Sequence, residues 1–301
     1  MGVADLQPQA LARQENCEAA TMTQLSIVIP AHNEALRLGA TLERVVQFLC
    51  ARQREQGAQS AAHQDPTASE EITARHDSAP TPAWRWEAIV VDDVSEDETY
   101  AIADSFRKKG FPVKVIRRTG RPGKGAAVGE GILTAAGQMI IFSDADLSTP
   151  IEEADRLIEW LNRGYDVVIA SRLLAGSKVE RPGYRELVSR LFSLMVRALA
   201  LPGIADSQCG FKAFEAEAAR ELFSRRTIHG WAFDVEILYL ARKLGFRIKE
   251  VPVRWVHSPQ SRLRPVRSAF SMVRDVLRVR LQDFSGVYRR QITPARGHNA
   301  S

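Results

Sequence analysis

Short apolar segments that alternate with helical ones constrain the fold of this chain most. Each apolar run has the length of a buried strand, and the segments between them carry apolar residues at helical spacing. The sequence predicts strands at 25–29, 87–91, 113–116, 139–142 and 166–170, and helices at 36–49, 99–109, 126–136 and 152–163. Parallel neighbours in a sheet need crossover connections, which are usually helices. The predicted fold class is therefore α/β, a single Rossmann-like domain with a mainly parallel sheet and helices on both faces.

Three segments lie outside this alternation. Residues 1–23 are predicted to be a polar, flexible lead, and the folded domain is expected to span residues 24–255. Residues 51–83 are rich in Ala, Gln, Ser, Thr, His and Pro without periodicity, so they are predicted to be a flexible insertion. Residues 256–301 are predicted to form a basic amphipathic helix and a tail. Pro30 is expected to end the first strand.

Composition narrows the class of protein. Of the 301 residues, 45% are hydrophobic and 26% are charged, which is ordinary for a soluble globular protein. No apolar run approaches the ~20 residues that span a bilayer, and the N-terminus lacks the order of a signal peptide. Cys17, Cys50 and Cys209 have no CxxC spacing, so neither a disulfide framework nor a zinc site is indicated. The expected location is the cytoplasm, with peripheral attachment to the inner face of a membrane as an extension.

The net charge of +5 is concentrated near the C-terminus. Nine Arg and two acids, Asp275 and Asp283, lie between Arg254 and Arg290. An apolar helical stripe in this region is bordered by arginines: Phe270, Val273, Leu277, Leu281 and Phe284 beside Arg267, Arg274 and Arg278. Such a helix suits an anionic membrane surface, or it packs its apolar face on the domain. No nucleic-acid recognition motif is present, so nucleic acid is not an expected partner.

Polar clusters follow three of the predicted strands, at residues 30–34, 92–97 and 144–146. The carboxyl ends of parallel strands form the ligand-binding edge of an open α/β sheet. Asp144 and Asp146 follow the strand that ends at Phe142, and two carboxylates in this arrangement suit a hard divalent cation such as Mg²⁺ or Mn²⁺. An Asp-rich turn that only closes the strand is the alternative.

Taken in order, these motifs resemble the family-2 glycosyltransferases with the GT-A fold. The matching segments are IVIPAHNE, VVDDVSEDET, GKGAAV, FSDADLSTP and ASR, and the resemblance covers roughly residues 24–255. Two further segments look most like the polyprenyl-phosphate sugar transferases within that family: DSQCGFKAF at 206–214 and WAFDVEILYLARKLGFRIKEVPVRW at 231–255. The family usually has Gly after the paired acids, where this chain has Val94.

The resemblance implies an inverting transferase that uses a nucleoside-diphosphate sugar, UDP-glucose, and a divalent metal, Mg²⁺ or Mn²⁺. It implies metal ligands at Asp144 and Asp146. It implies a donor-binding set made of Pro30, Asn33, Glu34, Asp92, Asp93, Lys124 and Asp144. Lys124 is expected to reach a donor phosphate, the alternative being a solvated lysine in a glycine turn. The loop lacks the full P-loop spacing, so an ATPase is not expected.

For the acceptor, the resemblance implies a polyprenyl or dolichyl phosphate. Arg172 and Arg185 fit the family's phosphate-binding arginines, the alternatives being an ordinary salt bridge for Arg172 and a solvated helix residue for Arg185. Asp206 is expected beside the acceptor, with structural capping as its alternative. Asp234 and Glu236 are expected either to close over the site or to be buried, hydrogen-bonded acids. Two other functions are carried forward: a transferase with a soluble acceptor, and a catalytically silent protein that binds membrane surfaces.

Overall fold

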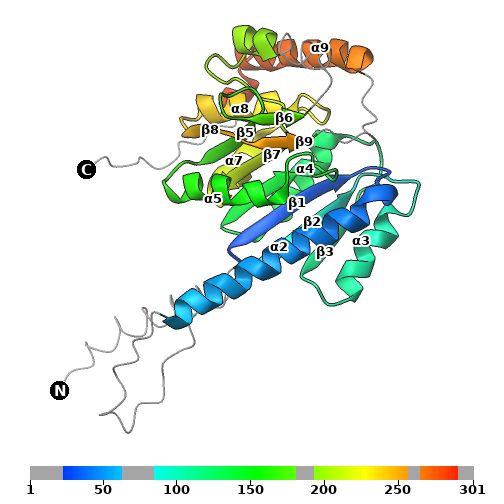
Figure 1. Cartoon of the computed structure of the whole chain (residues 1–301). Helices are drawn as coiled ribbons and strands as arrows, with labels where there is room; N and C mark the ends of the chain where they lie inside the picture. The colour runs from blue at the N-terminus through cyan, green and yellow to red at the C-terminus, as the bar shows by residue number, and fades with distance from the viewer. Residues whose placement is uncertain (1–22, 63–84, 181–192, 257–264, 291–301) are drawn as a thin grey trace, which may run out of the picture.

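The computed structural model describes residues 23–62, 85–180, 193–256 and 265–290 (Figure 1). Its main sheet has the strand order β3-β2-β1-β4-β7-β5-β8. The strands are β1 (Leu25–Ala31), β2 (Trp86–Asp92), β3 (Val113–Arg117), β4 (Met139–Ser143), β5 (Val167–Ser171), β7 (Phe211–Glu215) and β8 (Ile248–Pro252). β7 runs antiparallel between β4 and β5, while the other neighbours are parallel. A small second sheet pairs β6 (Lys178–Glu180) with β9 (Arg254–Val256).

Helices cover both faces of the sheet. They are α2 (Ala35–Ala62), α3 (Thr99–Lys108), α4 (Lys124–Thr134), α5 (Ala154–Asn162), α7 (Ala216–Arg225), α8 (Phe233–Lys243), α9 (Pro265–Phe284) and α10 (Val287–Arg290), with a 3₁₀ turn η2 at Ile151–Glu153. In β1, Ile27 and Ile29 pack in the layer of α2, α3 and α5, whereas Val28 packs in the layer of α4, α7, α8 and α9. A strand buried on both faces needs a mostly apolar sequence, and in LSIVI the one polar residue, Ser26, donates a hydrogen bond to Glu87 at 2.6 Å. The α/β prediction is confirmed.

Pro30 does not end the first strand, which continues to Ala31. The pairing of β1 with β4 stops at Val28, whereas the pairing with β2 continues to Ala31. Pro30 therefore lies where β1 has a partner on one side only, and a proline is tolerated where its missing N–H is not needed for a ladder. The antiparallel β7 was not foreseen, because its FKAFE sequence carries no mark of strand direction.

The predicted flexible insertion begins too early. Residues 51–62 continue α2, since Ala, Arg, Gln and Glu are good helix formers even without an apolar face. Gln53 accepts a hydrogen bond from Trp86 Nε1 at 3.0 Å, and Arg52 forms an ion pair with Asp155. These contacts join this part of the helix to the domain. The rest of the predicted insertion, residues 63–83, lies outside the described residues, as do residues 1–22 of the predicted lead.

The C-terminal helix exists as α9, but the face that packs on the domain is not the predicted stripe. Val276 and Val279 are fully buried, whereas Leu277, Leu281 and Phe284 are 45%, 67% and 94% exposed. This finding contradicts the alternative in which the stripe packs on the domain. No helix in the described part of the chain combines the length and apolar character needed to cross a bilayer.

Two glycines in helices give a matched test of the packing. A Cβ at Gly131 in α4 would lie 2.4 Å from Val28 Cγ1, whereas a Cβ at Gly57 in α2 would meet nothing within 4 Å. We expect Gly131→Ala to lower the free energy of unfolding by about 1–2 kcal/mol through overpacking against the sheet. Gly57→Ala should raise it by about 1 kcal/mol through helix propensity. Urea denaturation measures both, and effects of the same sign would contradict the close contact of α4 with β1.

Candidate functional site

The carboxyl ends of the parallel strands carry the unusual backbone conformations of this fold. In the described part of the chain, three residues other than glycine have positive φ: Asn33 (55°) after β1, Val94 (59°) after β2 and Leu147 (45°) after β4. Left-handed backbone costs an L-residue about 1–2 kcal/mol, and such strain concentrates at functional sites. All three residues lie at the same edge of the sheet, where open α/β folds bind their ligands. We therefore take this edge as the candidate site.

Asp144, Asp146 and Lys124 come together just beyond β4. Lys124 Nζ lies 2.6 Å from Asp144 Oδ1, and Asp146 Oδ1 accepts a hydrogen bond from the Ser148 amide at 3.0 Å. The side chain of Asp144 remains 35% exposed, so its carboxylate is open to a ligand. This ion pair joins the predicted metal ligands to the predicted phosphate-binding lysine, although they lie about twenty residues apart in the sequence.

Lys124 is a buried lysine, not a solvated one. Its side chain is only 15% exposed, and its Nζ lies 5.4 Å from the ring centre of Phe142 and 4.9 Å from that of Trp231. Burial alone would lower the pKa of Lys124, but Asp144, Asp234 and Asp146 outweigh it, so the pKa is raised above its usual value. Lys124 therefore keeps a fixed positive charge beside Asp144.

Gly210 is a residue of the site that sequence reasoning missed. A Cβ at this position would lie 1.8 Å from Asp144 Oδ2, and the Gly210 carbonyl accepts a hydrogen bond from the Asp144 amide at 3.1 Å. The close approach follows from β7, which runs antiparallel to β4 and begins one residue after Gly210. Gly210 is visible in the sequence as the glycine of DSQCGFK. Only the pairing of β7 with β4 shows that a glycine is needed there, because Asp144 lies against it.

The paired acids after β2 have different surroundings. Asp92 is fully buried, and its Oδ1 accepts a hydrogen bond from the Ser95 amide at 3.2 Å. Asp92 Oδ2 is buried and accepts no hydrogen bond from the described residues; Arg117 Nε lies 3.7 Å away. Asp93 has both oxygens occupied, by Arg118 and by the Gly123 amide at 2.7 Å. Asp93 thus fixes the loop before Lys124, whereas Oδ2 of Asp92 remains an unused hydrogen-bond acceptor.

The Pro30–Glu34 segment is held against the loop that follows Asp92 and Asp93. The Asn33 amide donates to Ser95 Oγ at 2.9 Å, and Asn33 Oδ1 accepts from the Glu96 amide at 2.8 Å. The Glu34 amide donates to Thr99 Oγ1 at 2.7 Å. Ser95 and Thr99 therefore shape this part of the site, a role that the motifs alone do not reveal. Val94 keeps the left-handed turn despite its β-branched side chain.

Arg172 and Asp206 form a bidentate pair at the end of β5. Arg172 Nε and Nη2 donate to the two carboxylate oxygens at 2.7 and 2.8 Å, and the Arg172 amide donates to Oδ2 at 2.9 Å. Burial would raise the pKa of Asp206, but Arg172 holds it below its usual value. Asp206 is fully buried, so it contacts Arg172 instead of facing open space. Arg185 lies outside the described residues.

Acids of α8 lie behind the site. Asp234 is buried and accepts from Lys212 Nζ at 2.6 Å; burial keeps its pKa raised even though Lys212 and Lys124 oppose the shift. Glu236 is fully buried and accepts hydrogen bonds from the Thr227 and Ile228 amides, each at 2.8 Å. Both acids therefore match the buried, hydrogen-bonded alternative.

Comparison with known proteins assigns the family. The family described as Glycosyl transferase family 2 matches residues 74–223. Dolichyl-phosphate beta-glucosyltransferase of Drosophila melanogaster is 33% identical over 276 residues, which cover 88% of this chain and 77% of the fly protein. The Homo sapiens protein of that name is 32% identical over 280 residues, 90% of this chain and 79% of its own length. The chain belongs to glycosyltransferase family 2.

Solved structures agree with the fold. Glucosyl-3-phosphoglycerate synthase from Mycobacterium tuberculosis in complex with UDP aligns with a TM-score of 0.57 at 21% identity, covering 91% of this chain and 84% of the synthase. Its complex with Mn²⁺, UDP-glucose and phosphoglyceric acid aligns with a TM-score of 0.59 at 20% identity, covering 90% and 82%. The fold is the GT-A fold, and the protein is a glycosyltransferase, so both predictions are confirmed.

The strain at Val94 is testable without any assay of activity. Val94→Gly removes the left-handed penalty of about 1–2 kcal/mol, offset in part by the greater freedom of glycine in the unfolded chain. We expect a net gain of about 0.5 kcal/mol in unfolding free energy. Val115→Gly, a half-buried valine in β3, is the control and should lose about 1 kcal/mol or more. Equal losses in the two variants, measured by urea denaturation, would contradict strain at Val94.

Proposed function

We propose that this glycosyltransferase moves glucose from UDP-glucose to a polyprenyl phosphate such as dolichyl phosphate, with inversion and with Mg²⁺ or Mn²⁺. The relatives named for transfer to dolichyl phosphate, 33% and 32% identical over most of this chain, support the acceptor and the sugar. The observation that carries the proposal is the Asp144–Lys124 pair at 2.6 Å with Asp146 two residues on. This arrangement offers carboxylates for a cation and a lysine for a phosphate at one strand end.

The carboxylates fit a divalent metal that takes most of its ligands from the substrate. Within the described residues, no cluster of three or more His, Cys, Asp or Glu side chains is arranged to hold a metal ion. Mg²⁺ commonly binds one or two carboxylates and completes its shell with phosphates and water, which matches Asp144 and Asp146. When bound there, the metal supplies Lewis-acid neutralisation of the charge on the leaving diphosphate.

In this proposal the donor's nucleoside lies beside Asp92. Asp92 Oδ2 is buried and accepts no hydrogen bond from the described residues. A rotation of the Asp92 side chain toward the site would let this oxygen accept a hydrogen bond from the N3–H of uracil and remove the cost of an unsatisfied acceptor. The loop of Pro30, Asn33 and Glu34 forms the neighbouring wall, which its bonds to Ser95, Glu96 and Thr99 hold rigid. In this proposal Asp93 acts indirectly, because it positions the Lys124 loop.

In this proposal the acceptor phosphate binds near Arg172 and Trp255. Trp255 lines a small pocket with Asp144 and Asp146, and the Arg172 guanidinium carbon lies 5.8 Å from the centre of its ring. Asp206 fixes the orientation of Arg172, so we assign Asp206 a positioning role and Arg172 a place beside the acceptor phosphate, together with Arg185.

The proposed reaction needs no proton removal from its acceptor. An acceptor phosphate oxygen, already anionic at neutral pH, forms the bond to the sugar's anomeric carbon. The bond from that carbon to the UDP oxygen breaks, and UDP departs with the electron pair. A strong general base is dispensable for such a nucleophile. This is compatible with Asp234 and Glu236 being occupied by protein groups.

A lipid acceptor requires access to a membrane surface, and α9 provides a suitable face. Leu277, Leu281 and Phe284 are exposed on it, with Arg274 and Arg278 also exposed nearby. An apolar stripe bordered by arginines suits the interface of an anionic membrane. We therefore propose peripheral attachment to the cytoplasmic face of a membrane, and no nucleic-acid partner.

The proposed metal ligands can be tested by an isosteric change. Asp146→Asn should lower turnover by two or more orders of magnitude, roughly 3 kcal/mol of transition-state stabilisation, because the amide is a weaker cation ligand. EDTA should have a comparable effect on the wild type. The control is Asp155→Asn, a 54% exposed aspartate far from the strand end, which should keep its activity. Near-normal activity in the Asp146 variant, with UDP-glucose and a short polyprenyl phosphate, would refute the assignment.

Membrane attachment can be tested on the exposed stripe. Leu281→Gln/Phe284→Gln should reduce co-sedimentation with vesicles about tenfold or more, because each buried apolar side chain is worth about 1.5–3 kcal/mol. Leu133→Gln on α4, 46% exposed, is the matched control and should bind vesicles like the wild type.

In an assay of transfer to a polyprenyl phosphate, glucose should be recovered in a product that is soluble in organic solvent. A protein that ignores vesicles and glucosylates only water-soluble acceptors would overturn the lipid acceptor.

A further inference from the structure

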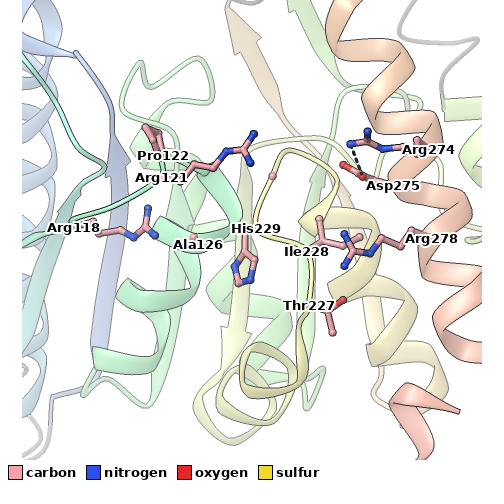
Figure 2. Close-up of a pocket in the computed structure, with 11 residues that line it drawn as sticks. Arg118, Arg121, Pro122, Ala126, Thr227, Ile228, His229, Arg274, Asp275 and Arg278 are labelled. Atoms are coloured by element: carbon pink, nitrogen blue, oxygen red, sulfur yellow. Dashed lines mark ion pairs between the residues drawn. The ribbon is translucent and has the colours of Figure 1, made fainter. Parts of the chain in front are cut away.

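A second cavity lies beside the candidate site and shares no residue with the pocket of Asp144 and Asp146. Its volume is about 630 Å³, and it is enclosed by the loop after β3, the loop at 227–230 and helix α9 (Figure 2). This volume lies in the range of small-molecule sites. Nothing in the proposed reaction uses this cavity.

The walls of the cavity are basic. Its charged lining consists of Arg118 and Arg121 from the loop after β3, and Arg274, Asp275 and Arg278 from α9. Arg118 pairs with Asp93 and Glu130, and Arg274 lies 3.6 Å from Asp275. Within the described residues, Arg121 and Arg278 form no ion pair. Figure 2 shows these two guanidinium groups on different sides of His229. The cavity thus carries uncompensated positive charge.

Arg226 adds a positive charge next to His229, which lines the cavity. Arg226 Nη1 lies 3.1 Å from His229 Nδ1, and Arg226 Nε is buried without a hydrogen-bond partner among the described residues. A Cβ at Gly129 would lie 2.0 Å from that Nε, so the arginine is packed flat against α4. Burial lowers the pKa of His229, and Arg226, Arg118 and Arg278 lower it further against the opposing effect of Glu236. Burial is the largest cause of this shift, and the arginines add to it.

We propose that this cavity is a second anion site, which binds a phosphate or phosphomonoester group separately from the donor diphosphate. Guanidinium groups match phosphate oxygens in two-pronged geometry, and Arg121 and Arg278 have such donors free of ion pairs. The cavity exceeds the size of one phosphate and leaves room for an organic part. Either a free phosphate compound or the phosphomonoester headgroup of a lipid offers this chemistry.

Two of the segments that line the cavity continue into Lys124 and Trp231 of the candidate site. The loop that carries Arg118 and Arg121 continues through Gly123, which donates to Asp93, into Lys124. The 227–230 loop is anchored to Glu236 and continues into Trp231, whose ring lies beside Lys124. An anion in the cavity therefore contacts α9 and the two segments that hold Lys124 in place.

Equilibrium dialysis of the full chain against labelled inorganic phosphate, in EDTA, tests the proposal without any transfer reaction. EDTA removes metal from the carboxylate site, and any phosphate bound by the proposed acceptor arginines is the same in every variant, so the difference between proteins reports the cavity. We expect a saturable component of binding that is weakened at least tenfold in Arg121→Ala/Arg278→Ala. Arg280→Ala is the matched control on the same helix outside the cavity, and it should bind within twofold of the wild type. Non-saturable binding, or equal affinity in all three proteins, would overturn the site.

Competition with vesicles identifies the source of the anion. Phosphatidylcholine vesicles containing phosphatidic acid, a monoester, are compared with vesicles containing phosphatidylglycerol, a diester, at equal charge. Displacement of phosphate by the first alone supports a lipid headgroup, and displacement by neither supports a free phosphate compound. Equal displacement by both would mean general surface charge and would contradict a shaped site. If the double variant melts below the wild type, Arg121→Ala alone, in an exposed loop, serves instead.

Discussion

The ion pair between Lys124 and Asp144 is the contact on which the active edge depends. Lys124 begins α4, Asp144 follows β4, and their 2.6 Å contact lies against the rings of Phe142 and Trp231. Behind it, Lys212 and Asp234 form a second buried pair at 2.6 Å. Opposite charges therefore alternate across the site, and each buried lysine has an acidic partner. Of the two pairs only Lys212–Asp234 is fully buried, and removing one member of such a pair typically costs about 3–5 kcal/mol.

The antiparallel β7 supplies much of this arrangement. It places Gly210 against Asp144 and Lys212 beneath Phe142, and the segment before it places Asp206 on Arg172. Glu250 of β8 in turn accepts the amides of Ala205 and Asp206 at 2.7 and 3.0 Å. The DSQCGFK segment is thus a structural support for Asp144 and Arg172 together. Cys209 within it is fully buried, and burial raises the pKa of its thiol to about 11, as expected of a packed side chain and not of a nucleophile.

Different faces of helix α9 have different surroundings. Val276 and Val279 join the core, Leu277, Leu281 and Phe284 are exposed, and Arg274 and Arg278 line the basic cavity. One amphipathic segment can therefore pack on the domain, offer an apolar stripe to a membrane and contribute to an anion site. These roles are compatible because residues at i, i+1 and i+2 point in different directions around a helix.

Sequence alone determined the order of strands and helices from β1 to β5, the strand-end placement of the acids and the transferase family. Buried parallel strands need apolar runs, and metal and phosphate chemistry need Asp and Lys in recognisable motifs, so these features are visible in local patterns. Only the tertiary structure decided that β7 is antiparallel, that Asp206 binds Arg172, that Lys124 is buried against Asp144 and that Val276 and Val279 are the buried face of α9. It also assembled the basic cavity from three distant segments. Each of these depends on which distant surfaces come into contact, and local spacing carries no record of those partners.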